Sequence, residues 1–90
     1  MPDISPRDAD IRRRRLLFRA THRGTRETDL LIGGFVRARL ASFTAADMDA
    51  LEEVMELPDT DLADWLTGRT AIPPACDSPM LQAIKAAVGA

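Results

Sequence analysis

The sequence predicts an all-α fold, a small five-helix bundle in a single domain. No segment alternates apolar and polar residues with the period that marks a half-buried strand. Aromatic residues are scarce, with three Phe, one Trp and no Tyr. The core must therefore be built from Leu, Met, Ile, Val and Ala, which suit helices better than strands. Ninety residues leave room for one core, so we expect a flexible leader at 1–9 and the bundle at 10–90.

The first helix is expected to start at Asp10, because an acid is favoured in the first turn of a helix. The strong helix formers of "IRRRRLLFRA" follow it. Gly24 is expected to end the helix, since glycine readily takes the backbone conformation that follows a last turn. The predicted apolar side of this helix consists of Ile11, Leu17, Phe18 and Ala20.

The second helix is expected to run from about Thr25 to Ser42 and to be apolar over much of its girth. Helical spacing gives two stripes along it: Leu31, Gly34, Phe35 and Ala38 form one, and Ile32, Val36 and Leu40 form the other. A glycine inside a helix costs about 1 kcal/mol relative to alanine. We interpret the pair Gly33 and Gly34 as a place where another helix approaches closely.

The third helix has the clearest start. Thr44 is a good N-cap, and Asp47 lies where a capping box places an acid, while Pro58 ends the helix. A short fourth helix is expected from a cap at Asp59 to a stop at Gly68. A fifth is expected to begin at Asp77 or Ser78, with Pro79 in its first turn. The predicted core positions of these three helices are Met48, Leu51, Val54, Met55, Leu62, Trp65, Leu66, Leu81, Ile84 and Val88.

The chain offers little for catalysis or metal binding. His22 is its only histidine and Cys76 its only cysteine, so it has no Cys/His cluster for zinc and no marked pair of nucleophile and base. We expect no catalytic residue, no metal and no tightly bound cofactor.

The same sequence predicts a cytoplasmic protein. A single cysteine fits a reducing compartment, and the first residues lack the apolar core of a secretory signal. No window approaches the roughly 20 apolar residues of a membrane span. We expect no membrane partner, and a monomer when the protein is free.

Charge is distributed unevenly along the chain. Residues 1–39 carry ten Arg against five acids, whereas residues 40–90 carry one Arg and one Lys against nine acids. The run "RRRR" at 12–15 spreads around the helix instead of forming one basic face. The acidic half also opposes nucleic-acid binding, which we do not expect. A small DNA-binding or general protein-interaction module that uses the basic first helix remains the alternative function.

The stretch "RGTRE" at 23–27 carries more charge than a turn between helices needs. Gly24 lets another backbone or a ligand approach closely. Arg23 and Arg26 carry forked donors that match carboxylate or phosphate, and Glu27 lies in the first turn of the next helix, where an anion is favoured. From the residues alone, a binding site and a simple cap with an ion pair across the turn are equally good interpretations.

Two motifs resemble one known family. "RGTRE", followed by Asp29 in "TDLL", is similar to the Arg-Gly-x-x-Glu signature of the SdhE-type flavinylation factors, called succinate dehydrogenase assembly factor 2 in mitochondria. "MELPDTDLADWLTG" at 55–68 is similar to the acidic turn and Asp-Leu-x-x-Trp-Leu helix of that family. The resemblance covers about residues 11–88.

The resemblance implies an assembly factor that is not itself an enzyme. It implies binding to the flavoprotein subunit of succinate dehydrogenase, and in bacteria sometimes of fumarate reductase, to promote covalent attachment of FAD to that subunit. Carried over to this chain, the partner-binding residues are Arg23, Gly24 and Glu27, supported by Arg26 and Asp29. Trp65 and the acidic helices are assigned to the core or to a secondary surface.

Overall fold

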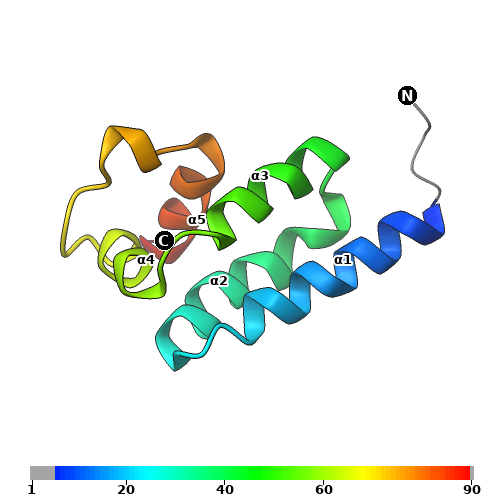
Figure 1. Ribbon diagram of the computed structural model, residues 1–90, viewed down its shortest axis with the longest axis horizontal. Coiled ribbons are helices and arrows are strands. Elements are labelled where there is room, and N and C mark those ends of the chain that lie inside the picture. The colour runs from blue at the N-terminus through cyan, green and yellow to red at the C-terminus, as the bar shows by residue number, and fades with distance from the viewer. Residues whose placement is uncertain (1–5, 90) are drawn as a thin grey trace.

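The structure is a computed structural model that describes residues 6–89. Five α-helices connected by short segments make up the described chain, which contains no strand (Figure 1). The all-α prediction is confirmed. The helices are α1 Pro6–Thr21, α2 Arg26–Arg39, α3 Ala45–Met55, α4 Asp59–Leu66 and α5 Pro79–Gly89, and Leu40–Ser42 and Pro74–Cys76 form short 3-10 turns.

Helix α1 begins four residues before the predicted start, at Pro6 instead of Asp10. Proline suits the first helical position because its missing N–H has no partner there in any case. Asp8 then supplies the acid of the first turn. Residues 6–9 of the expected leader are therefore helical, and residues 1–5 of it lie outside the described residues.

Two of the central helices begin with side-chain caps, and the capping box predicted for α3 is confirmed. Thr25 caps α2 by accepting a hydrogen bond from the Thr28 N–H at 3.3 Å. Thr44 and Asp47 form the complete capping box of α3, with N–H to side-chain oxygen distances of 3.1 Å and 2.9 Å. The α-helical part of α2 ends at Arg39, and the 3-10 turn carries the chain on to Ser42.

The cap predicted for α4 is wrong. Pro58 holds the N-cap position without a side-chain hydrogen bond, and Asp59 is the first helical residue. The Asp59 carboxylate accepts a hydrogen bond from Arg23 instead. A charged donor from the turn between α1 and α2 thus binds the carboxylate that the local sequence assigned to the helix start.

The core lies where all five helices meet. Trp65 is 6% exposed, so its assignment to the core is confirmed. The prediction for α1 was wrong in part, because Ile11 and Phe18 are exposed while Leu16 is buried. The buried apolar residues are Leu16, Ala20, Ile32, Phe35, Val36, Leu40, Phe43, Met48, Leu51, Val54, Met55, Leu62, Trp65, Leu66, Met80, Leu81 and Ile84.

The two glycines of α2 have different surroundings. A Cβ at Gly33 would lie 2.9 Å from Cγ2 of Thr21 and 3.4 Å from the Ala20 carbonyl oxygen, so α1 and α2 approach closely there, as predicted. A Cβ at Gly34 would meet nothing within 4 Å. The prediction of close approach is therefore wrong for Gly34 as far as residues 6–89 are concerned.

Candidate functional site

The corner between α1 and α2 is formed by residues 22–29, which include the "RGTRE" signature. Gly24 has a φ of +99°, a left-handed conformation that side-chain-bearing residues resist. Thr25 follows in an extended conformation and caps α2. The sequence forms a sharp turn here because a permissive residue and a good cap are adjacent.

Arg23 points into the protein from this corner. Its side chain is 9% exposed. Its Nε donates to Oδ1 of Asp59 at 2.6 Å, and its two terminal nitrogens donate to the carbonyl oxygens of Met55 at 2.8 Å and Leu57 at 2.9 Å. The last carbonyls of a helix have no partner within the helix, so Arg23 satisfies the end of α3 and joins it to the start of α4.

Asp29 completes this inner half of the corner. Its Oδ1 accepts the main-chain N–H of Arg23 at 2.5 Å, which holds the turn against the first turn of α2. The chain therefore uses the carboxylate of Asp29 and the fork of Arg23 internally. From the sequence we expect the guanidinium of Arg23 to bind a carboxylate of a partner. In the structure this guanidinium is buried and bonded within the chain, which does not support that expectation.

The outer half of the corner consists of Gly24, Arg26 and Glu27, all of them exposed. The space beside Gly24 is open, with nothing within 4 Å of where a Cβ would lie. The side chain of Arg26 makes no hydrogen bond or ion pair within the described chain. Glu27 pairs through Oε1 with Nη2 of Arg69 at 2.7 Å, and Nε of Arg69 contacts Oδ1 of Asp64 at 3.0 Å.

A shallow hollow of about 380 Å³ lies next to Glu27. Two residues of this hollow, Asp64 and Arg69, were not predicted from the sequence. They lie about forty residues after Glu27, and no local pattern indicates that they are close to it. The hollow is lined by Thr25, Glu27, Asp59, Thr60, Ala63, Asp64 and Arg69. Asp59 is paired with Arg23. Glu27 and Asp64 share the guanidinium of Arg69, so one carboxylate of this surface is left without a cation of its own.

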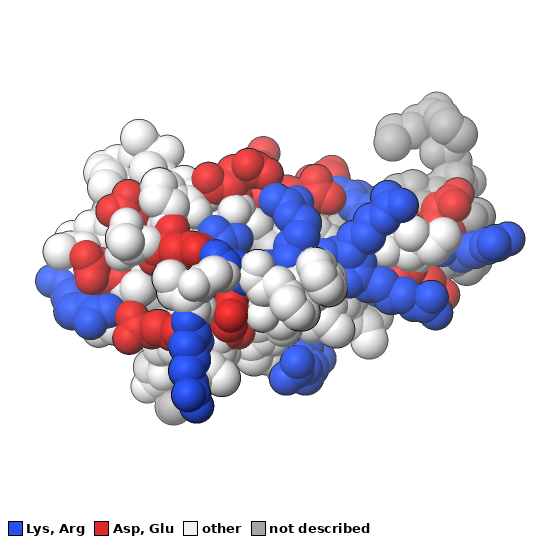
Figure 2. Space-filling model, turned by 60° about the horizontal axis from the view of Figure 1, so that its bottom comes forward, with Lys and Arg blue, Asp and Glu red and all other residues white. Residues whose placement is uncertain are grey.

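Two arginines of α1, one of them in the basic run at 12–15, pair with acids of α3 and of the residue that follows it. Arg12 contacts Asp49 at 2.5 Å and Glu52 at 2.9 Å, and the hydrogen bond to Asp49 raises the pKa of its guanidinium above the ordinary value. Arg19 pairs with Glu56 at 2.9 Å. Figure 2 shows basic and acidic side chains interleaved on one face of the molecule. Such a surface does not resemble the continuous basic footprint of a nucleic-acid-binding protein.

Across residues 6–89, every helix is too short or too polar to span a bilayer. The same residues contain no group of three or more His, Cys, Asp or Glu side chains placed to hold a metal ion.

A family model described as "Flavinator of succinate dehydrogenase" matches residues 14–88, which include the corner and Trp65. The chain belongs to this family. The resemblance seen in the two sequence motifs is therefore confirmed. The partner-binding roles of Arg23, Gly24, Arg26, Glu27 and Asp29 stay predictions.

Curated relatives agree with the flavinator family. The chain is 54% identical over 71 residues to the FAD assembly factor SdhE of Acetobacter pasteurianus, a match that covers 79% of this chain and 65% of the relative. It is 34% identical over 68 residues to the mitochondrial succinate dehydrogenase assembly factor 2 of Scheffersomyces stipitis, covering 76% of this chain and 46% of the relative. The chain thus spans about half to two thirds of the length of these relatives. No solved structure matches it.

Proposed function

We propose that this chain is an assembly factor that binds the flavoprotein subunit of succinate dehydrogenase in the cytoplasm and promotes covalent attachment of FAD to it. In this proposal the chain binds no cofactor tightly and performs no chemistry itself. The related flavoprotein subunit of fumarate reductase is the second partner to test. Membership of the flavinator family supports the proposal at the level of the process.

The observation that carries the proposal is the division of the corner into a buried inner half and an exposed outer half. Arg23 ties the turn to α3 and α4 through three side-chain hydrogen bonds. The adjoining Gly24, Arg26 and Glu27 face solvent. A rigid support under exposed recognition groups lowers the ordering cost of binding, since little conformational freedom is then lost on association.

The Glu27 carboxylate is available to a partner at low cost. Its pair with Arg69 is about half exposed on both sides, at 49% and 54%. Exposed ion pairs of this kind contribute about 0–1 kcal/mol, so exchanging Arg69 for a cation or N–H donor of the flavoprotein loses little. The open space beside Gly24 allows the partner's backbone to come near enough to do this.

The factor would act by positioning. Attachment needs a histidine of the flavoprotein to lie against the reacting carbon of the flavin, and correct placement alone accelerates such a step. By binding preferentially to the flavoprotein conformation in which these atoms meet, the chain shifts the subunit toward it.

The test uses cells that lack the gene and are complemented with the wild type, Glu27→Ala or Glu53→Ala. Glu53 is an exposed acid on α3 with no ion pair in the described chain, so its substitution removes the same charge elsewhere. Covalent flavin fluorescence at the mass of the flavoprotein subunit is read on denaturing gels. We expect the band to be absent without the gene, present with the wild type and Glu53→Ala, and strongly reduced with Glu27→Ala.

Two results would contradict parts of this proposal. A fluorescent band of full strength in the deletion strain would remove the flavinylation function. A band restored fully by Glu27→Ala and by Gly24→Arg would leave the function but remove the corner as its site. Circular dichroism of each purified variant confirms that the substitution has not unfolded the chain.

A further inference from the structure

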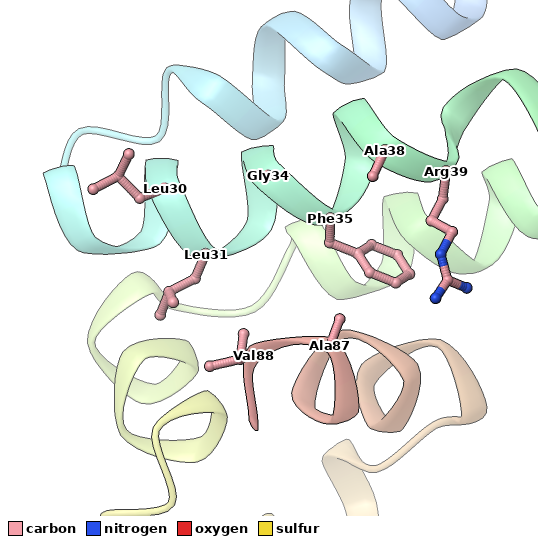
Figure 3. Close-up of a pocket in the computed structure, with 8 residues that line it drawn as sticks. All are labelled: Leu30, Leu31, Gly34, Phe35, Ala38, Arg39, Ala87 and Val88. Atoms are coloured by element: carbon pink, nitrogen blue, oxygen red, sulfur yellow. The ribbon is translucent and has the colours of Figure 1, made fainter. Parts of the chain in front are cut away.

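An apolar groove runs between α2 and α5, away from the hollow beside Glu27. Its volume is about 370 Å³. Figure 3 shows Leu31 and Phe35 of α2 facing Val88 and Ala87 of α5 across it. The groove is lined by Leu30, Leu31, Gly34, Phe35, Ala38, Arg39, Ala87 and Val88, of which only Arg39 is charged.

Contacts within residues 6–89 do not explain two features of α2. Leu30 is 64% exposed at the edge of the groove. Gly34, in the middle of a helix, has ordinary helical backbone and open space where its Cβ would lie. A glycine there costs the helix about 1 kcal/mol relative to alanine. At Gly33, one residue earlier, the same cost is offset by the close packing of α1. At Gly34 no helix of the described chain packs as closely.

The one charged side chain among the residues that line the groove is a cation, Arg39. From Leu30 to the end of α2 the charged residues are Arg37 and Arg39, and α5 contributes only Lys85. None of these three cations makes an ion pair within the described chain. Arg39 instead lies over the Phe35 ring at 5.5 Å. An occupant that complements this surface has apolar side chains flanked by carboxylates.

We propose that the groove binds an acidic amphipathic helix of the flavoprotein subunit, which crosses α2 at Gly34. An amphipathic helix laid in an apolar groove is a recurrent mode of recognition, and the missing side chain of Gly34 lets its backbone come close. The carboxylates of the helix meet Arg39 and Arg37. This inference rests on the proposed function and adds a second contact surface to the corner.

Gly34→Leu is the main test variant because it fills the groove without straining the chain. The φ angle at this position is not positive, and the space around it is free. We therefore expect the melting temperature to stay level or to rise. Ala46→Leu is the matched control, which adds apolar bulk at an exposed position of α3 outside the groove. Arg39→Glu tests the charge, with Arg14→Glu on α1 as the control for an equal charge change at an exposed, unpaired arginine.

The measurement is the Kd for the purified flavoprotein subunit, by calorimetry at low and high salt. We expect Gly34→Leu to raise the Kd by about tenfold or more, as the loss of a well-packed contact does. Arg39→Glu should raise it several-fold at low salt and less at high salt, because ions screen exposed charges. Ala46→Leu should bind like the wild type, and Arg14→Glu should have at most a small effect.

The outcomes separate this inference from the proposed function. A wild-type chain that does not bind the flavoprotein subunit overturns both. Wild-type affinity for Gly34→Leu and Arg39→Glu, with weak binding by Glu27→Ala, overturns the groove and leaves the corner. Size-exclusion chromatography tests a third outcome. If the wild-type chain self-associates and the Gly34→Leu chain does not, the groove binds a second copy of this chain and the inference is overturned.

Discussion

The two arginines of the "RGTRE" signature have opposite surroundings, although only two residues lie between them. Arg23 is 9% exposed and holds Asp59 and the carbonyls of Met55 and Leu57. Arg26 is exposed and makes no ion pair within residues 6–89. The left-handed Gly24 lies between them and turns the chain, so that one arginine faces inward and the next outward.

One short motif is thus divided between a buried support and an exposed surface. The inner half, Arg23 with Asp29, holds the corner to the rest of the bundle. The outer half, Gly24 with Arg26 and Glu27, is the part that a partner can reach. Substitutions in the inner half should therefore act on folding, and substitutions in the outer half on binding.

The largest effect on stability is expected for Arg23→Ala. Removing one member of a buried, hydrogen-bonded charge pair costs about 3–5 kcal/mol, because the partner stays buried without compensation. Loss of the donors to the end of α3 adds to this cost. Urea denaturation measures the change, and Arg23→Lys should recover only part of it, since an ammonium cannot reproduce the fork. A loss below 1 kcal/mol would contradict the anchoring role.

A smaller loss is expected for Gly24→Ala, about 1–2 kcal/mol, because a side chain at φ +99° strains the backbone. Gly34→Ala is the matched control, with equally open space but ordinary helical backbone. It should instead stabilise the chain by about 0.4–1 kcal/mol. Thermal melts of the two variants should shift in opposite directions, and a shift in the same direction would contradict the backbone explanation.

The pair between Glu27 and Arg69 should contribute little to stability. A double-mutant cycle of Glu27→Gln and Arg69→Ala is expected to give a coupling free energy below about 1 kcal/mol, because both side chains are about half exposed. Flavin attachment should nevertheless fall with Glu27→Gln, which keeps the shape and removes the charge. A large coupling energy without a functional defect would place Glu27 with the inner half of the corner.

The smallest effect on folding is expected for Arg26→Ala. The side chain has no partner within the described chain, so the melting temperature should not change. Binding to the flavoprotein should weaken, and more so at low salt, because the lost charge is exposed. If the melting temperature falls as far as with Arg23→Ala, the division of the corner into two halves is wrong.

Local signals in the sequence were sufficient for most helix boundaries. Thr25 and the capping box of Thr44 and Asp47 form hydrogen bonds within three residues, which a sequence displays directly. The start of α1 was missed because Asp10 offered a second acceptable start four residues after Pro6. The cap of α4 was missed because Asp59 bonds to a residue 36 positions away.

The sequence by itself determined an all-α chain, the capping box of α3, the core position of Trp65 and the family of the chain, because these depend on neighbouring residues or on recognisable motifs. Only the tertiary structure decided that Arg23 turns inward and that Glu27 pairs with Arg69. It also decided that α1 packs against Gly33 while the space beside Gly34 is free. These outcomes depend on which faces of the helices are buried against one another. The contacts join residues 12 to 42 positions apart in the sequence. No local pattern specifies such pairs, since their partners are brought together only when the helices assemble.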